Sequence, residues 1–331
     1  MPRTPRLASL ALAVVLPLAC ESSESPGPAA GGDSPRKVTI QLNWVPEPEF
    51  GGLYEAERIG AFAAEGLAVE ILAGGPGVPA PQLAASGKVD LAVVSGDQLL
   101  TLGAVGGDLV AVYAIYQLDP FGVMVHASNP IASMEELWRS RSTVACETNL
   151  AWVAMLNGKY GGKDLAFIPY SGNVAQFAAD PTLAQQCFIT AEPVTLELQG
   201  TPVKVFPTRD SGFNPYNGVL AARRSFVEEE AETVDRLVRA MQKGWESYLA
   251  DPRPANEIMA RLNPAMSVEA MDLGARRQEP IIRTEETARL GLGAMTAGRW
   301  KETADQLVAL DKLKVAPAPE SLFRWEAPTS P

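Results

Sequence analysis

Short apolar runs typical of strands alternate with helical patterns from Lys37 to about Pro207. The chain then turns helical from Ser225 onward. Two capping boxes predict helix starts, Ser133 with Glu136 and Ser225 with Glu228. Strands that alternate with helices indicate α/β layers with mostly parallel sheets. The strand patterns are "KVTIQLNW", "LAVEILAG", "VDLAVVSG", "DLVAVYAIY", "FGVMVHA", "STVACET", "LAFIPYSG", "QQCFITAEP" and "PVKVFPT".

The strand patterns fall into two clusters, separated by "YAIYQLDPFG" and "RDSGFNPYNG". We interpret these two segments as crossings between two lobes. The first lobe would comprise residues 37–118 and 216–331, and the second residues 119–215. A chain of 331 residues that is 47% hydrophobic can give each lobe a core. The sequence therefore predicts a ligand cleft between the lobes, since clefts between domains and carboxyl ends of strands bind small molecules.

The N-terminus has the pattern of an export signal. Arg3 and Arg6 precede an apolar stretch that is too short to span a bilayer. We predict a signal peptide over residues 1–19, a flexible tether over 20–36, and a lipid anchor on Cys20, since "PLAC" is similar to the lipobox of bacterial lipoproteins. Pro17 departs from the usual lipobox, and ordinary signal cleavage that leaves Cys20 unmodified is the alternative. The tether is rich in Ser, Gly, Pro and Ala, a composition that does not fold.

The net charge of −11 argues against nucleic acid as a partner, because its binding requires clustered Lys and Arg. Catalysis and metal binding have little support in the sequence. The single histidine, His126, lies within an apolar strand pattern, and no cluster of metal-ligating residues is evident. We therefore expect no cofactor and no enzymatic activity.

Several candidate binding residues follow predicted strands. Asn43 and Trp44 end the first strand, and the indole of Trp44 is suited to stacking on a ring. Tyr170 ends the strand "LAFIPY" in the same way, and Glu192 follows "QQCFIT". A carboxylate at Glu192 would accept charge-assisted hydrogen bonds from ring N–H groups, although a helix N-terminus also favours an acidic residue.

Four blocks of the sequence resemble the substrate-binding proteins of ABC importers that are related to thiamine-pyrimidine and riboflavin binders. They are "LNWVPEPEFGGLYEAERIGAFAAEGLAVEI", "LAASGKVDLAVVSGDQLL", "AQQCFITAEP" and "GRWKETADQLVALDKLK". The resemblance extends from Lys37 to Leu313, and the wider group includes nitrate, sulfonate and taurine binders. It implies a two-lobed periplasmic-binding-protein fold of type II, which closes on a solute and delivers it to a membrane permease.

The resemblance also concerns single residues. It implies a ligand contact at Glu192. Phe50 stands where the thiamine-pyrimidine branch usually has His, and Glu47 where it has Asn, which favours a larger or more apolar ring. Glu49 and Tyr54 are candidates for the cleft, with solvent exposure and core packing as their respective alternatives. The complete set of predicted ligand residues is Asn43, Trp44, Glu49, Phe50, Tyr54, Ser95, Gln98, Thr148, Asn149, Trp152, Tyr170, Asn173 and Glu192.

Two hypotheses for the function follow. The first is a lipid-anchored monomeric receptor on the extracytoplasmic face of a bacterial membrane, which captures a planar heterocycle for a permease. The second is an enzyme on the same fold, similar to the thiamine-pyrimidine synthases or the menaquinone-pathway enzymes. The synthases use a His and a Cys-rich motif that this chain lacks, so we favour the receptor. Cys146 and Cys187 are compatible both with a disulfide and with two buried thiols.

Overall fold

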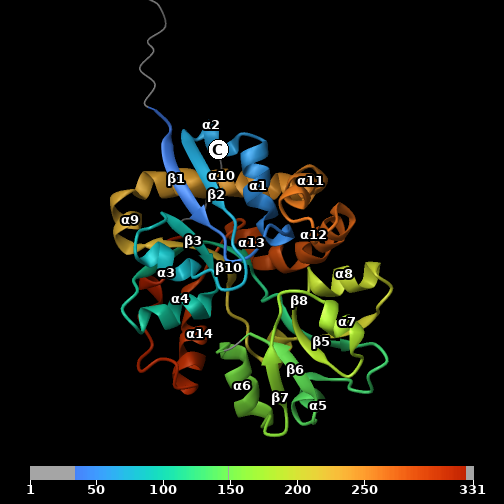
Figure 1. The fold of residues 1–331 in the computed structure, drawn as a ribbon. Coiled ribbons are helices and arrows are strands. Elements are labelled where there is room, and N and C mark those ends of the chain that lie inside the picture. The colour runs from blue at the N-terminus through green and yellow to red at the C-terminus, as the bar shows by residue number, and fades with distance from the viewer. Residues whose placement is uncertain (1–33, 148, 326–331) are drawn as a thin grey trace, which may run out of the picture. The chain divides into compact units, whose positions relative to one another are not determined.

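The computed structural model describes residues 34–147 and 149–325, whose strands form two five-stranded sheets (Figure 1). The first sheet has the order β2-β1-β3-β10-β4. Its strands are β1 (Arg36–Gln41), β2 (Leu67–Leu72), β3 (Leu91–Val94), β4 (Leu109–Tyr116) and β10 (Asn217–Arg223). The second sheet has the order β7-β6-β8-β5-β9. Its strands are β5 (Phe121–His126), β6 (Thr143–Cys146), β7 (Ala166–Pro169), β8 (Ala184–Phe188) and β9 (Val203–Pro207).

Both sheets are mixed, with the same arrangement of strand directions. β1 pairs in parallel with β2 and β3, and β10 runs antiparallel to β3 and β4. In the second sheet β6 pairs in parallel with β7 and β8, and β5 runs antiparallel to β8 and β9. The expectation of mostly parallel sheets is therefore wrong for two of the four pairings in each sheet.

Strand β10 accounts for both antiparallel pairings of the first sheet and was not among the predicted strands. The chain returns from the second sheet into the middle of the first, between β3 and β4. Its residues from Asn217 to Ala222 are all buried. The sequence signal for β10 was a short apolar run after the second predicted crossing.

The chain passes between the sheets twice, once between Tyr116 and Phe121 and once between Pro207 and Asn217. Arg299 ties these two crossings together. Its guanidinium donates hydrogen bonds to the carbonyl of Gln117 and to the carbonyls of Asn214 and Pro215. The division into lobes at 118/119 and 215/216 stays a prediction.

The helices lie around the two sheets (Figure 1). The single helix expected after Gly51 is divided into two helices, α1 and α2, because Gly60 between them adopts a left-handed conformation. The predicted capping box at Ser225 is wrong, since α9 begins one residue earlier and Ser225 lies inside it. At Ser133 the cap is present, and the hydroxyl accepts a hydrogen bond from the Glu136 N–H at 3.1 Å. The helices before the last crossing are α1 (Gly51–Arg58), α2 (Ala61–Ala64), α3 (Ala80–Ala85), α4 (Gly96–Gly103), α5 (Met134–Trp138), α6 (Ala151–Tyr160), α7 (Ala175–Ala179) and α8 (Glu192–Leu198).

The C-terminal helices pack mainly beside the first sheet, and α10 lies against α1 and α2 (Figure 1). They are α9 (Arg224–Glu229), α10 (Ala231–Ala250), α11 (Arg253–Leu262), α12 (Val268–Ile282), α13 (Glu285–Leu290) and α14 (Ala297–Ala309). Short 3-10 turns complete the description: η1 (Pro48–Phe50), η2 (Thr208–Ser211) and η3 (Pro319–Ser321). No helix among the described residues is long and apolar enough to span a membrane.

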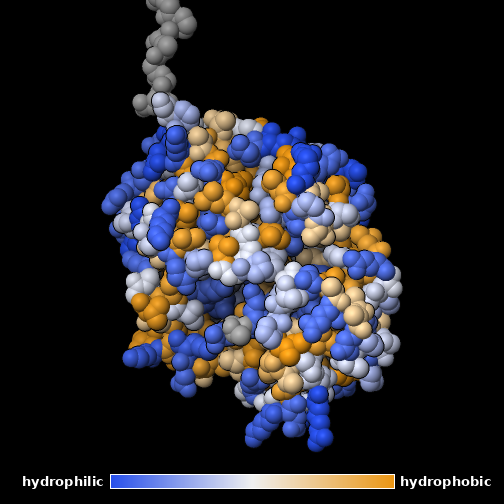
Figure 2. Space-filling model, viewed as in Figure 1, coloured by the Kyte–Doolittle hydropathy of each residue, from blue (hydrophilic) through white to orange (hydrophobic). Residues whose placement is uncertain are grey.

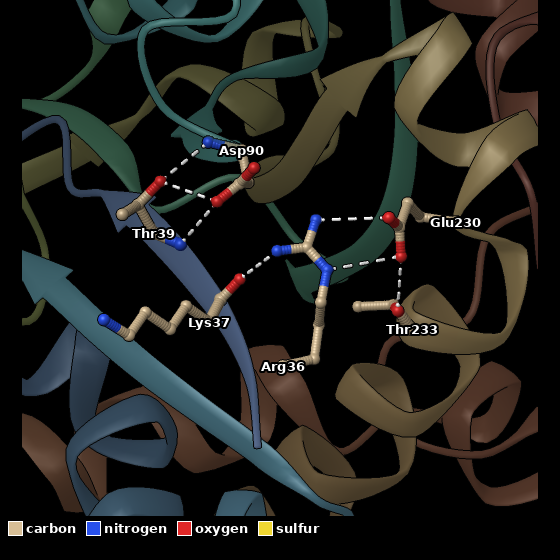
Figure 3. Close-up of polar contacts among 6 residues, drawn as sticks. All are labelled: Arg36, Lys37, Thr39, Asp90, Glu230 and Thr233. Carbon is tan, nitrogen blue, oxygen red and sulfur yellow. Dashed lines mark hydrogen bonds and ion pairs between the residues drawn. The ribbon is translucent and has the colours of Figure 1, made fainter. Parts of the chain in front are cut away.

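Polar side chains of neighbouring segments bind to residues of β1 (Figure 3). The Asp90 carboxylate accepts hydrogen bonds from the Thr39 N–H and hydroxyl, both at 2.8 Å. Arg36 forms an ion pair with Glu230 at 3.2 Å. The Glu230 carboxylate also accepts a hydrogen bond from the Thr233 hydroxyl. This ion pair is partly exposed and contributes little to stability. The buried side chains of Val38 and Ile40 hold the strand more strongly, since both are fully excluded from solvent.

The two cysteines of the described residues, Cys146 and Cys187, are free and buried. The alternative of a disulfide is therefore wrong, and strand register is the reason. Val144 pairs with Ala184 and Ala145 with Gln185, so Cys146 lies level with Gln186. Neighbouring side chains of a strand point to opposite faces. Cys146 consequently packs into one hydrophobic cluster and Cys187 into another.

The predicted signal peptide, the lipidation site at Cys20, most of the tether and Thr148 lie outside the described residues.

We predict that Gly244→Ala destabilises the contact between α1 and α10. A Cβ at Gly244 would lie 2.2 Å from the carbonyl oxygen of Gly52 and 2.6 Å from the Cβ of Ala56. Overpacking of this kind costs about 1–3 kcal/mol. The matched control is Gly298→Ala in α14, where a Cβ meets no atom within 4 Å. We expect urea unfolding to show lower stability for the first variant and unchanged or higher stability for the second. Equal effects would contradict the close packing.

Candidate functional site

Two adjoining cavities lie between the two sheets, and segments that directly follow strands of both sheets line them. We call the first the small compartment; its volume is about 50 Å³. The small compartment is lined by Asn43, Trp44, Glu47, Glu49, Phe121, Glu147, Tyr170, Gln186, Phe188 and Glu192. The second, the large compartment, has a volume of about 300 Å³ and shares Asn43, Trp44, Phe121, Glu147 and Phe188 with the first. The face in Figure 2 is hollowed between the positions of α4 and α6 in Figure 1, and hydrophilic residues lie inside.

Aromatic rings from both sheets approach each other in the small compartment. Trp44 follows β1 and Tyr170 follows β7, and their ring centroids are 6.4 Å apart with an interplanar angle of 17°. Phe121 and Phe188 pack edge to face at 4.7 Å. These faces provide an apolar surface suited to a planar ligand.

Glu192 is held by two hydrogen bonds at the start of α8. The Tyr170 hydroxyl donates to one carboxylate oxygen at 2.5 Å, and the Phe188 N–H donates to the other at 2.8 Å. Burial raises the pKa of Glu192 above its ordinary value, and these two hydrogen bonds oppose the rise. Burial and the adjacent Glu192 carboxylate also raise the pKa of Tyr170. The pair therefore presents an oriented acceptor to the small compartment.

Two further glutamates approach Glu192 from the other sheet. Burial raises the pKa of Glu49 to about 8, and the negative charge of Glu192 adds to the rise. Burial likewise raises the pKa of Glu47 well above its ordinary value, with Glu49 and Glu192 contributing, while hydrogen bonds from Trp44 and Asn263 oppose it. Close carboxyl groups in a buried place favour bound protons or a bound cation.

The C-terminal helices fix the segment that carries Glu47 and Glu49. The side-chain amide of Asn263 donates to the Pro46 carbonyl at 3.1 Å, and that of Gln278 donates to the Pro48 carbonyl at 2.8 Å. Gln278 in turn accepts a hydrogen bond from the Tyr116 hydroxyl at 2.7 Å. All these amide contacts are buried, so they hold the prolines and the intervening glutamate at a defined position.

The large compartment extends past Trp44 towards α4 and the crossings. Its further residues include Gln82, Ser95, Asp97, Gln98, Asp119, Trp152 and Asn217. The Ser95 hydroxyl donates to Asp97 at 2.5 Å, and the Ser95 N–H donates to Gln98 at 3.1 Å. Burial raises the pKa of Asp119 to about 6, although Asn217 and Thr208 donate hydrogen bonds to it.

Eight of the predicted ligand residues line these two compartments. They are Asn43, Trp44, Glu49, Ser95, Gln98, Trp152, Tyr170 and Glu192. Whether each contacts a ligand stays a prediction.

The structure places four other predicted residues elsewhere. Phe50 and Tyr54 belong to the main hydrophobic core, with 1% and 8% of their surface exposed, and line neither compartment. For Tyr54 the structure therefore shows the alternative given above, packing in the core. Asn149, which has a positive φ of 65°, and Asn173 are exposed and also line neither compartment. The amide of Asn173 instead forms local hydrogen bonds with Ser171 and Ala175.

Several lining residues were not among the predicted ones. Glu47 was noted only as a departure from a family motif, and Glu147, Gln186 and Asp119 were not singled out. Glu147 directly follows β6, so the strand-end argument that selected Tyr170 applied to it as well. Asp119 lies in the first crossing, and no local pattern distinguishes it from a surface aspartate.

A third and larger hollow, of about 790 Å³, lies beside α4 and the segment after α14. It contains none of the predicted ligand residues, and two of its lining residues, Val105 and Val315, are largely exposed. The two compartments described above, in contrast, contain six carboxyl groups, of which Glu49 and Asp119 are buried and Glu147 is exposed. No group of three or more potential metal ligands occurs among the described residues.

The fold is that of the periplasmic binding proteins. The structure is similar to the periplasmic aliphatic sulphonate binding protein SsuA of Escherichia coli, with a TM-score of 0.67, 13% identity and coverage of 90% of this chain and 94% of that one. It is also similar to the desulfurization enzyme DSZB, with a TM-score of 0.58, 15% identity and coverage of 87% and 97%. At these identities the likeness concerns the fold alone.

The chain belongs to the NMT1/THI5 like family, whose model matches residues 47–255. Riboflavin-binding protein RibY of Chloroflexus aurantiacus is 24% identical over 325 residues, which cover 89% of this chain and 89% of that protein. The formylaminopyrimidine-binding protein of Halalkalibacterium halodurans is 23% identical over 325 residues, with coverage of 96% and 97%. The resemblance inferred from the sequence is thus confirmed at the level of the family.

We predict that the ligand-free protein loses stability as the pH rises, partly through Glu49. Its pKa is about 8 in the folded protein against an ordinary value of 4.5. Its contribution is therefore fully present below about pH 4.5 and is lost as the pH rises through about 8, by at most about 1.4 kcal/mol per pH unit. Glu49→Gln should flatten the dependence in urea unfolding between these pH values. The exposed Glu302→Gln serves as a control that keeps the wild-type slope; an unchanged slope in Glu49→Gln would contradict the prediction.

Proposed function

We propose that the protein is the substrate-binding component of an ABC importer and that its compartments bind a small ring compound carrying hydrogen-bond donors or a positive charge. One observation carries the proposal. The described lining of the two compartments contains six carboxyl groups and several aromatic rings, but no Lys, Arg or His. The six are Glu47, Glu49, Asp97, Asp119, Glu147 and Glu192.

The chemistry of this lining disfavours an anionic solute. A sulfonate or nitrate ion that leaves water needs a cation or several donors to offset its desolvation. The carboxylates offer repulsion instead. Ring N–H groups, amino groups or a ring cation would find acceptors at Glu49 and Glu192, and charge-assisted hydrogen bonds of this kind are the strong ones.

The family relatives support the same class of ligand. Two of them are named for binding riboflavin and a formylaminopyrimidine, both of which are nitrogen heterocycles. The sulfonate binder shares the fold at 13% identity. Fold does not determine the ligand, which depends on the side chains of the site. The names of these relatives thus support the proposed class of ligand.

Binding without catalysis is the more economical reading of the site. The lining contains no Cys among the described residues, and both thiols pack in hydrophobic clusters. His126 lines neither compartment, and its Nε2 lies 2.7 Å from the Phe177 carbonyl oxygen. The described lining therefore offers neither a thiol nor an imidazole, and the Ser95 hydroxyl donates its hydrogen bond to Asp97.

We further propose that the protein acts as a monomer on the extracytoplasmic face of a bacterial membrane, held there by a lipid on Cys20, and that it delivers its solute to a permease. The proposal rests on the N-terminal sequence pattern and on the role that the family relatives imply.

We expect Cys20→Ser to release the protein from the membrane. Replacing the sulfur removes the atom that would carry the lipid, and the apolar segment alone would then be insufficient to anchor the chain. Fractionation of cells followed by immunoblotting measures the effect. Cys146→Ala should leave the membrane association intact, because that thiol is buried in the folded part. Wild-type protein in the soluble fraction would contradict the anchor.

We expect a thermal shift with riboflavin or a formylaminopyrimidine and none with taurine or nitrate. A ligand at a hundred times its Kd stabilises the folded state by about 2.7 kcal/mol. Glu192→Gln should weaken binding by about tenfold or more, since hydrogen bonds to a charged group contribute about 1.5–3 kcal/mol. Trp44→Ala should weaken it through loss of the stacking face.

Glu197→Gln is the matched control for Glu192→Gln. It lies on the same helix, α8, with an exposed side chain that pairs with Arg277. Its ligand affinity should equal that of the wild type. A shift with taurine or nitrate that survives Glu192→Gln would overturn the proposed class of ligand.

A further inference from the structure

Asp119 joins the two crossings through both its backbone and its side chain. Its N–H donates a hydrogen bond to the side-chain oxygen of Asn214 at 2.8 Å, and its carbonyl accepts one from Arg209 at 2.7 Å. Its carboxylate accepts from the Thr208 hydroxyl and the Asn217 amide, each at 2.9 Å and one at each oxygen. All four partners belong to the second crossing or to the first residue of β10, whereas Asp119 itself belongs to the first crossing. Four hydrogen bonds on one residue therefore hold the crossings together.

The side-chain part of this contact is buried and has a fixed direction. Asp119, Thr208 and Asn217 are all buried. The side-chain oxygen of Asn217 accepts a hydrogen bond from the Gly218 N–H at 2.8 Å, so its NH₂ group faces Asp119. Without an acceptor on Asp119, this NH₂ group would stay buried and unpaired, which is costly. The contact therefore requires an acceptor oxygen on the side that faces Asn217.

The first crossing begins beside the segment that carries Glu47 and Glu49. The hydroxyl of Tyr116, the last residue of β4, donates a hydrogen bond to Gln278 at 2.7 Å. Gln278 in turn donates to the Pro48 carbonyl at 2.8 Å, and both hydrogen bonds are buried. A shift of this end of the crossing would therefore move the first two glutamates of the small compartment.

The same crossing ends beside the segment that carries Glu192. The carbonyl of Pro120, the residue after Asp119, accepts a hydrogen bond from the Ile189 N–H at 3.0 Å. The N–H of Phe188, the neighbour of Ile189, donates to the Glu192 carboxylate at 2.8 Å. The first crossing thus connects the segments that carry the carboxyl groups of the small compartment, and Asp119 lies between its two ends.

Asp119 differs in one respect from Arg299, which also ties the crossings. Arg299 lines neither compartment, whereas Asp119 lines the large one. The Asp119 carboxylate has lone pairs left beside the hydrogen bonds from Thr208 and Asn217. A solute donor in the large compartment can therefore bind the same carboxylate that joins the crossings.

We propose that Asp119 is a positioning residue of the solute site. By joining the two crossings it sets the separation of the two sheets, and with it the distance of Glu192 from Glu47 and Glu49 in the small compartment, which Asp119 itself does not line. Connections of a few residues allow two parts of a protein to change their relative position, and hydrogen bonds between such connections oppose the change. The inference concerns the frame of the site and holds for any class of solute.

The test measures the separation of the sheets in the ligand-free protein. Spin labels attached through Glu57→Cys in α1 and Ala178→Cys in α7 give a distance distribution by pulsed electron paramagnetic resonance. Both positions are exposed, and α7 packs on the second sheet through its buried phenylalanine. Cys146 and Cys187 are buried away from the label. Cys20→Ser in the purified full-length chain removes the remaining thiol.

Asp119→Ala removes both acceptor oxygens and should broaden the distribution. Because each hydrogen bond to a charged group changes an equilibrium by about tenfold or more, the population outside the wild-type distances should rise by about a hundredfold. Thr208→Val removes one of the two hydrogen bonds and should raise this population by about tenfold. Asp119→Asn should keep the wild-type distribution, because its amide retains an oxygen for Asn217 and can donate to the Thr208 hydroxyl.

Asp97→Ala is the matched control. Asp97 also lines the large compartment, but its carboxylate accepts from Ser95 at the start of the same helix and has no hydrogen bond to a crossing among the described residues. Its distance distribution should equal that of the wild type. An unchanged distribution in Asp119→Ala, or in Thr208→Val where Asp119→Ala does not fold, would overturn the inference. Broadening in Asp97→Ala or Asp119→Asn equal to that in Asp119→Ala would overturn it too. None of these results depends on the solute, so the proposed function stands or falls separately.

Discussion

Glu47 and Glu49, which follow β1, and Glu192, which follows β8, come together at a place where Glu49 is buried and the other two are half-buried. Burial of a carboxylate is costly, and a second negative charge nearby increases the cost. The raised pKa values show how the protein meets this cost without a ligand: the carboxyl groups retain protons more readily than they would in water. A donor-rich or cationic solute would replace those protons. The rest of the architecture brings these three groups to one point.

That architecture consists of two sheets of the same design. In each, parallel strands carry their following segments to the same edge, and antiparallel strands connect the sheets. Arg299 ties the two crossings through backbone carbonyls, and Asn263 and Gln278 hold the segment that bears the first two glutamates. The C-terminal helices therefore support the site from outside, although none of their residues line it.

The same fold can carry site linings of different chemistry. A sulphonate binder with a TM-score of 0.67 shares the arrangement of elements, yet the lining here offers acceptors and aromatic faces. Specificity in such a scaffold depends on a few side chains at strand ends, and these can change without any effect on the sheets.

Local sequence patterns were sufficient to predict the α/β class, most strands, and the strand-end positions of Asn43, Trp44, Tyr170 and Glu192, which line the compartments. Each of these residues follows a strand, and the rule that ligands bind beyond strand ends requires no knowledge of packing. The family resemblance had the same local basis, since its motifs lie in short continuous blocks.

Only the tertiary structure decided the features that depend on contacts between distant segments. Phe50 turns into the core because the segment after Pro48 packs under α12, while its neighbour Glu49 faces the compartment. The register of β6 and β8 places the two cysteines on opposite faces of the second sheet. After the second crossing, β10 inserts between β3 and β4 in the first sheet. The sequence determined which residues end the strands; the packing of elements far apart in the chain determined which of those residues meet.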